Sequence, residues 1–246
     1  ATRIREDYLR ILRFFRFFAW YGRGEPDAAG LAACAALAPG MSRLSAERVS
    51  KELLKLLAAP DPGPAMAAMD AAGVLARVLP EGAVSPAFAG LVRLSDDPVL
   101  RLMVLIPADP TATAEVSRRL RLPNRMRDRL AAAALAGAEV DPSMTEPQLR
   151  AAIYRHGGRA VADALLRRSA EQPEQRSALD ALLGALEGWE PPRMPVGGRD
   201  LARLGVPPGP QTGRLLKAFE AAWIADDFPA EGHAARLEAL VREGRG

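Results

Sequence analysis

Apolar residues recur at intervals of three and four along almost the whole chain, and this helical period is the feature that most limits its fold. The apolar positions are filled largely by alanine and leucine, which favour helix over sheet. Aromatic residues make up only 5% of the sequence, and no segment alternates polar and apolar residues for long enough to indicate a strand. A chain of 246 residues with 49% hydrophobic content can form one or two packed domains. We therefore predict an all-α protein, and the pattern argues against a β-sandwich or barrel.

Charge and cysteine content narrow the functional classes. The chain has 33 Lys and Arg against 30 Asp and Glu, and this net charge of +3 is a mild bias towards anionic partners. Cys34 is the single cysteine, which excludes a disulfide framework, and His156 and His233 are too far apart in sequence to suggest a metal cage. No apolar stretch reaches the roughly 20 residues that span a bilayer, and no signal peptide opens the chain. We expect a cytoplasmic protein, and the charged helical pattern that starts at Ala1 suggests a segment of a longer one.

Proline and glycine divide the helical pattern into separate segments. We predict helices over residues 3–21, 26–37, 46–58, 65–72, 74–79, 86–94, 97–105, 111–120, 124–136, 145–155, 159–170, 174–187, 212–225 and 230–242. Ser45 is the expected N-cap of the third helix. Prolines and glycines crowd residues 187–210, which indicates the entry to a small last unit.

The polar face of the first predicted helix brings Glu6, Asp7 and Arg10 into one patch. At about 100° per residue, Asp7 and Arg10 lie roughly 60° apart, and Glu6 lies about 40° from Arg10. A carboxylate beside a guanidinium can accept from the exocyclic amine of cytosine or adenine and donate to the neighbouring ring nitrogen. Uracil and guanine present the opposite arrangement and would be rejected. The same spacing also describes ordinary ion pairs, Glu6 with Arg10 and Arg3 with Asp7, and on the pattern alone that interpretation is favoured.

The opening segment also carries a resemblance to a known family. Residues 3–17, R-I-R-E-D-Y-L-R-I-L-R-F-F-R-F, closely resemble the E-D-x-x-R segment of the class II tRNA nucleotidyltransferases, which comprise the CCA-adding enzymes and bacterial poly(A) polymerases. In that family the segment opens the neck domain, and its Asp and Arg act as a protein template for incoming CTP and ATP. The resemblance implies this role for Asp7 and Arg10, with Glu6 as their neighbour.

Two further stretches resemble the same family, in its order and approximate spacing. Residues 44–57 look like its E-R-(I/V)-x-x-E-L-x-K-L-L motif, which implies that Arg48 and Glu52 support the neck; an i,i+4 ion pair between them describes almost the same arrangement. Residues 195–216 are similar to its G-x-D-L…G-x-x-P-G-P-x-x-G-x-x-L tail segment. There Arg214, near a helix start, suits an RNA phosphate, although a simple loop and cap fit that segment equally well.

The resemblance implies an elongated all-α arrangement of a neck with the nucleotide-reading helix (residues 1–80), a helical body (81–190) and a tail (191–246). In the family, carboxylates that hold two metal ions lie on a β-sheet head domain that precedes the neck. We therefore expect Mg²⁺ to bind in a head that is missing here but present in cis, with no cofactor in this segment. The segment alone is predicted to be inactive. The implied partners are the tRNA 3′ end, CTP and ATP, with no membrane.

Other interpretations of the sequence stay open. The chain can instead be a stand-alone helical RNA-binding module, or part of a poly(A) polymerase rather than a CCA-adding enzyme. The arginines around Pro123, among them Arg118, Arg119 and Arg125, either meet tRNA phosphates or merely keep helix surfaces soluble. The acidic pairs at residues 96–97 and 226–227 are interpreted as cap and surface residues.

Overall fold

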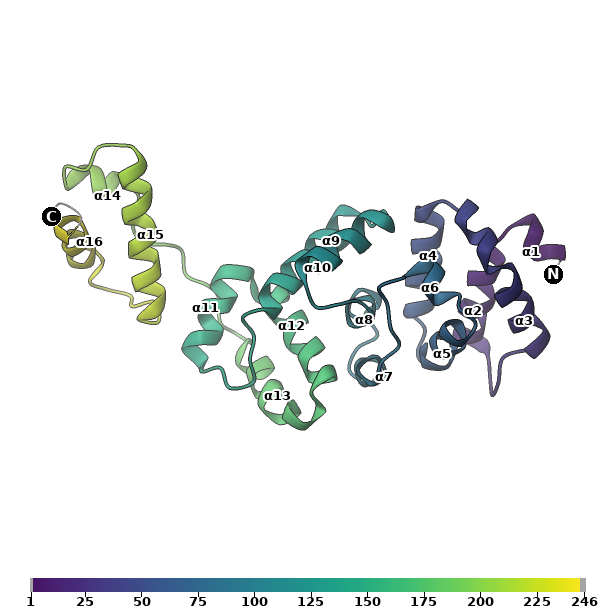
Figure 1. Cartoon of the computed structure of the whole chain (residues 1–246). Coiled ribbons are helices and arrows are strands. Elements are labelled where there is room, and N and C mark those ends of the chain that lie inside the picture. The colour runs from purple at the N-terminus through teal and green to yellow at the C-terminus, as the bar shows by residue number, and fades with distance from the viewer. Residues whose placement is uncertain (1, 244–246) are drawn as a thin grey trace.

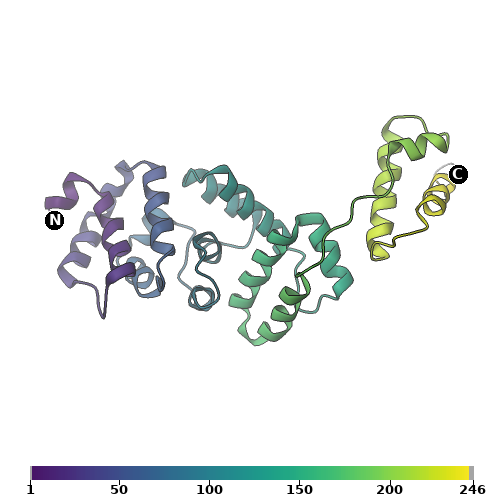
Figure 2. The same ribbon diagram turned by 180° about the vertical axis from the view of Figure 1, so that it is seen from behind.

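The computed structural model describes residues 2–243, and every regular element in this range is a helix. The α-helices are α1 (Thr2–Glu6), α2 (Leu9–Tyr21), α3 (Ala28–Leu37), α4 (Ala46–Leu57), α5 (Gly63–Ala71), α6 (Leu75–Val78), α7 (Pro86–Val92), α8 (Pro98–Leu105), α9 (Pro110–Arg119), α10 (Asn124–Gly137), α11 (Glu146–His156), α12 (Gly158–Glu171), α13 (Arg176–Ala185), α14 (Gly198–Arg203), α15 (Pro210–Ala225) and α16 (His233–Glu243). The chain is elongated, with its two ends at opposite ends of the molecule (Figure 1), and the view from behind shows the same arrangement (Figure 2). The prediction of an all-α fold is confirmed.

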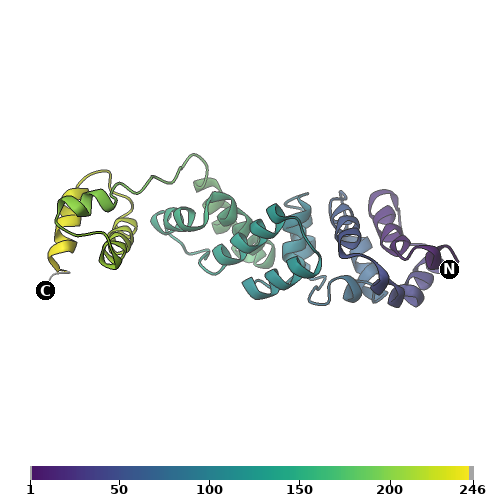
Figure 3. The same ribbon diagram turned by 90° about the horizontal axis from the view of Figure 1, so that it is seen from above.

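Three hydrophobic cores follow one another along the molecule. The first runs from Leu9 in α2 to Ala133 in α10 without a break near residue 80 and also includes Ala170. The second is built from α10 to α13, between Ala136 and Leu182. The third lies in the last three helices, from Leu201 to Val241, and an extended segment separates these helices from the rest (Figure 3). The domain boundaries at residues 80 and 190 stay a prediction, and the first core continues across the former.

Local capping explains several helix starts. Asp27 accepts a hydrogen bond from the Gly30 amide at the start of α3 (2.6 Å), and Ser45 accepts one from the Arg48 amide at the start of α4 (3.4 Å). Asp97 accepts from the Val99 amide (2.9 Å) and so caps α8, as predicted for the acidic pair at residues 96–97. Short polar side chains at these positions satisfy amides that have no partner inside the helix.

The first predicted helix is not continuous, which corrects the expectation of one helix over residues 3–21. It ends at Glu6, passes through Asp7 and Tyr8, and begins again at Leu9. The Asp7 carboxylate accepts from the Leu9 amide (3.1 Å), an interaction by which Asp starts a helix rather than continuing one. The 60° separation of Asp7 and Arg10, calculated for an unbroken helix, therefore does not apply.

The chain also has two 3-10 segments that the sequence pattern did not predict. The second predicted helix ends at Leu37 as expected, but a 3-10 helix over Ala38–Arg43, which contains Pro39 and Gly40, follows it directly. The helix predicted over 174–187 is instead a 3-10 turn, Pro173–Gln175, followed by the shorter α13. Within Ala38–Arg43, Gly40 leaves room for the Tyr8 ring, because a Cβ at position 40 would lie 1.9 Å from that ring.

A buried arginine connects α8 to the end of α4. Arg101 is 1% exposed, and its guanidinium donates to the carbonyl oxygens of Leu57 and Ala59, both at 2.6 Å. It also donates to the carbonyls of Ser95 (2.8 Å) and Val92 (3.3 Å). Burial lowers the pKa of this guanidinium from its ordinary value, against the influence of nearby carboxylates. One side chain thereby satisfies carbonyl groups that would otherwise be buried without a donor.

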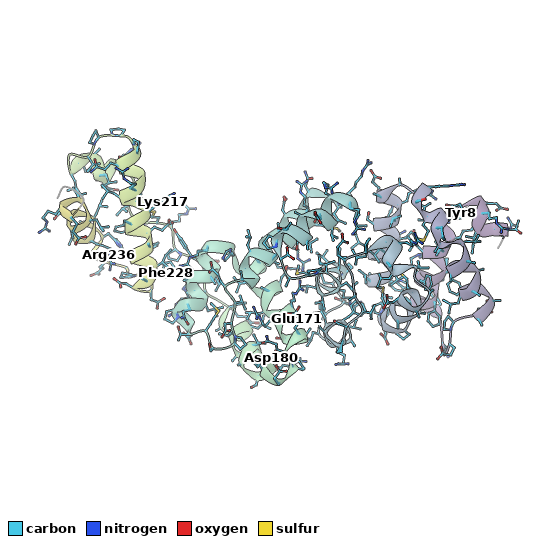
Figure 4. The ribbon with its side chains drawn as sticks, viewed as in Figure 1. Tyr8, Glu171, Asp180, Lys217, Phe228 and Arg236 are labelled. Atoms are coloured by element: carbon cyan, nitrogen blue, oxygen red, sulfur yellow. The ribbon has the colours of Figure 1, made fainter. Side chains whose placement is uncertain are left out.

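The joint between the second and third cores is held by polar and aromatic contacts. Arg150 of α11 forms a two-pronged ion pair with Asp227 (2.8 and 2.6 Å), and the Tyr154 hydroxyl donates to Glu220 of α15 (2.8 Å). Phe228, labelled at this joint in Figure 4, packs with its ring centroid 5.3 Å from that of Tyr154. Asp227 and Phe228 both have positive φ, 61° and 58°, a conformation that non-glycine residues adopt at a cost of about 1–3 kcal/mol each.

We expect Arg101→Met to reduce the free energy of unfolding by about 3 kcal/mol, because the new side chain fills similar space but leaves buried carbonyls without donors. Urea denaturation followed by circular dichroism measures the effect. Arg93→Met is the matched control, since the Arg93 side chain is exposed and has no hydrogen bond or ion pair with any residue between 2 and 243. Equal stability of the two variants would contradict the structural role of Arg101.

Candidate functional site

The candidate site lies at the junction between α1 and α2, near the N-terminal end where Figure 4 labels Tyr8. Asp7 is fixed there from two directions. Its Oδ1 accepts from the Leu9 amide (3.1 Å), and its Oδ2 accepts from Nη2 of Arg48, at the start of α4 (2.8 Å). The carboxylate is therefore held by a backbone donor of its own turn and by a guanidinium 41 residues away.

The Asp7 carboxyl is held in its charged form. Partial burial raises its pKa, but the Leu9 amide and Arg48, with a further contribution from Arg13, outweigh that effect and leave the pKa below its ordinary value of 3.8. A hydrogen-bonded carboxylate beside a cation keeps its negative charge at neutral pH. Asp7 consequently presents an acceptor, and not a donor, to any group that approaches it.

Glu6 and Arg10 are exposed on either side of Asp7. The Arg10 amide donates to the Asp7 carbonyl (3.0 Å), so these two residues belong to one turn. Among residues 2–243, the Arg10 guanidinium has one ion contact, a long one with Glu6 (3.8 Å), and the Arg10 side chain is 44% exposed. Arg3 pairs with Glu6 at 3.6 Å, and not with Asp7 as the ion-pair interpretation expected. A loosely held guanidinium thus lies one turn from a firmly held carboxylate.

Arg48 and Glu52 do not pair with each other, although the i,i+4 interpretation expected them to. Arg48 instead reaches Asp7, and Glu52 accepts from Nε of Arg16 in α2 (2.8 Å) with Lys55 at 3.7 Å. Glu52 is only 6% exposed. Both residues therefore connect α4 to the opening segment.

Sequence reasoning missed these long-range partners. Arg16 is one of several arginines on the first helices, and its pattern does not distinguish it from an exposed one. Trp20 carries no signal in the sequence either, yet its Nε1 donates to the Lys55 carbonyl (2.8 Å) and adds a third connection between the opening segment and α4. The only sequence signal for a contact between α4 and the opening segment was the position of Glu52 within the motif of residues 44–57.

The four arginines predicted to bind RNA differ in their surroundings. Arg119 is half-buried and donates to the Val78 carbonyl (2.7 Å) and to Glu81, so the protein itself holds its guanidinium. Arg118, Arg125 and Arg214 are exposed and have no ion pair or hydrogen-bonded side chain within the part of the chain that the structure describes. These three can meet an anion without breaking an existing interaction.

The described residues offer neither a metal cluster nor a reactive thiol. Between residues 2 and 243, no group of three or more His, Cys, Asp or Glu side chains is placed to hold a metal ion. The buried Cys34 thiol has its pKa raised to about 11 by desolvation, which makes it a poor nucleophile. No described helix has the length and apolar character needed to cross a bilayer.

The fold and site define an elongated all-α protein with a carboxylate and guanidinium at the opening of its first helical bundle. A family model described as "Probable RNA and SrmB-binding site of polymerase A" matches residues 26–85. CCA tRNA nucleotidyltransferase 1, mitochondrial, from Danio rerio is 28% identical over 244 residues, which cover 91% of this chain and 53% of that protein. The Homo sapiens protein of the same name is 27% identical over 256 residues, which cover 93% and 54%.

Solved structures show the same fold. The Bacillus stearothermophilus CCA-adding enzyme in complex with CTP has a TM-score of 0.71 at 22% identity, covering 99% of this chain and 64% of that one. The Thermotoga maritima CCA-adding enzyme complexed with tRNA-CCA has a TM-score of 0.61 at 17% identity, covering 98% and 62%. The resemblance to the CCA-adding family that the motifs indicate is thus confirmed. The chain spans about half the length of the curated relatives it matches, and a cytoplasmic location stays a prediction.

We expect Asp7→Asn to lower the free energy of unfolding by about 0.5–1 kcal/mol at pH 7, because it removes the charge facing Arg48 while keeping an oxygen for the Leu9 amide. The folded pKa of Asp7 is depressed, so this stabilisation is present above its ordinary pKa and disappears as the pH falls through the folded value. Urea denaturation at pH 7 and at successively lower pH values, continued below 3.8, measures this stabilisation and its loss. Asp70→Asn, at an exposed carboxylate with no ion pair among the described residues, is the control. A difference that persists at the lowest pH would argue against the ion pair as its source.

Proposed function

We propose that this chain is the neck, body and tail portion of a tRNA nucleotidyltransferase that adds C and A nucleotides to the tRNA 3′ end. In this proposal Asp7 and Arg10, with Glu6 beside them, select CTP and ATP, and Arg48 and Glu52 support them. The observation that carries it is the fixed, charged Asp7 carboxylate one turn from the exposed Arg10. This arrangement supplies the acceptor and donor that the pairing edges of cytosine and adenine require.

Catalysis and RNA binding belong to parts of the enzyme other than the neck. Magnesium and the carboxylates that hold it belong to a head domain outside this segment, and this segment alone is inactive. The body and tail bind the tRNA through exposed arginines such as Arg118, Arg125 and Arg214. The exposure of these arginines supports tRNA binding, as does the fold that this chain shares with a CCA-adding enzyme complexed with tRNA. The head is expected in the same polypeptide.

A second candidate is a poly(A) polymerase of the same family. The observation that favours it is the family model over residues 26–85, whose description names polymerase A. Both candidates share the nucleotide-reading chemistry but differ in their products. The complete enzyme, incubated with tRNA lacking its 3′ end and with each NTP separately, distinguishes them: a CCA-adding enzyme requires CTP and stops, whereas a poly(A) polymerase extends with ATP alone.

In the complete enzyme we expect Asp7→Asn and Arg10→Ala to relax the preference for CTP and ATP over UTP and GTP by roughly 5- to 150-fold, which corresponds to about 1–3 kcal/mol for one base-edge contact pair. Competition between nucleotides for incorporation into tRNA measures this ratio. Arg5→Ala is the control, because Arg5 is exposed on α1 without an ion pair to any described residue. Unchanged nucleotide choice in both site variants would refute the nucleotide-reading role.

A further inference from the structure

A cavity of about 430 Å³ opens between α10 and the start of α12, and no motif predicted it. Its volume lies within the range of roughly 300–1,000 Å³ that is typical of ligand sites, and it exceeds what one small ion requires. Three arginines line it: Arg125 and Arg129 from α10, and Arg159 from α12. The site lies in the body, distinct from the Asp7 region.

Two carboxylates hold two of these arginines in place. Asp163, only 1% exposed, accepts from Nε of Arg129 (2.6 Å) and from Nε of Arg159 (3.1 Å). Asp97 accepts from the same two guanidiniums at 2.7 and 3.0 Å. Neither carboxylate is among the residues that line the cavity, so the guanidiniums face the cavity and the carboxylates do not.

Arg125 is the guanidinium in this wall without a partner. It is exposed and has no hydrogen bond or ion pair with any residue from 2 to 243, apart from those of its backbone. Three arginines against two carboxylates leave one uncompensated positive charge at the cavity. A free guanidinium beside two fixed ones favours an anion that accepts several hydrogen bonds, and phosphate has the matching geometry.

His156 also lines the cavity, and its Nε2 lies 3.1 Å from Oε1 of Glu139; the other side chains of the wall are apolar, from Val99, Met126, Ala132 and Ala160. Gly157, with φ of 84°, ends α11 and leaves the entrance to α12 without a side chain. The backbone amides of the first turn of α12 add donors there, although the arginines and the cavity alone define the site. An apolar surface next to fixed cations suits a ligand with a charged group on a ribose and base, better than it suits a bare ion.

We infer that this cavity binds one nucleotide unit of an RNA strand, with its phosphate on Arg125, Arg129 and Arg159 and its sugar and base against the apolar wall. This inference rests on the proposed function, since it takes the RNA to be the tRNA that the body holds. The cavity would then hold the tRNA at one defined position on the body, in addition to the exposed arginines spread over its surface.

The test compares tRNA affinity of the 246-residue chain and its variants by filter binding at several salt concentrations. Arg125→Ala removes the free guanidinium, and Ala132→Leu fills the cavity without changing charge. We expect each to weaken tRNA binding about fivefold to tenfold, and Arg125→Ala to reduce the salt dependence by about one phosphate contact. Arg93→Ala is the matched control on an exposed arginine elsewhere and is expected to change nothing. Circular dichroism checks that all variants are folded.

The outcomes separate this inference from the function on which it rests. If the parent chain binds tRNA and both cavity variants bind it equally well, the inference is wrong and the proposed function stands. If Arg125→Ala weakens binding but Ala132→Leu does not, the arginine acts on the surface and the cavity is not the site. Affinity for free CTP is measured in parallel. If the cavity variants lose affinity for CTP but keep their affinity for tRNA, the inference is also wrong. If the parent chain does not bind tRNA, the proposed function itself fails.

Discussion

The packing of α2 against α4 is the constraint on which the candidate site depends. Three polar contacts connect α2 and the Asp7 turn before it to α4: Asp7 with Arg48, Arg16 with Glu52, and Trp20 with the Lys55 carbonyl. Because these contacts follow the same order along both segments, α2 and α4 run in the same direction. A buried carboxylate such as Glu52 is costly unless it is paired, so a shift of one helix along the other would leave it uncompensated. The pairs therefore fix the position of the Asp7 turn.

Arginine has two separate roles in this chain. Several guanidiniums hold the fold together: Arg101 and Arg167 donate to backbone carbonyls, and Arg129 is bound between two carboxylates. Others, such as Arg118 and Arg125, have no ion pair among the described residues and can meet a ligand without giving up a partner. With a net charge of only +3, attraction of a polyanion must come from where these free cations lie and not from the total charge.

The sequence alone predicts the elements whose causes are local. The helix of residues 46–58 matches α4 within one residue, because Ser45 caps it and its apolar residues repeat with helical period. The break at Asp7 was not predictable in the same way, since the apolar pattern continues through it while Arg48, which holds the carboxylate, lies 41 residues away. Arg101 shows the same limit, because nothing in its neighbourhood on α8 distinguishes a buried arginine from an exposed one.

The cores determine how a bound nucleotide and a bound RNA can be related. Asp7 precedes a core that runs from Leu9 to Ala133 as one unit, and Arg125 and Arg129 lie on α10, which that core includes. Their separation is therefore set by close-packed side chains, which resist deformation. The last three helices have their own core and meet α11 through the Arg150–Asp227 ion pair and the rings around Phe228. An RNA strand held in the α10–α12 cavity would thus be positioned relative to Asp7 by one rigid core, whereas its contacts with Arg214 would depend on a joint made of few interactions.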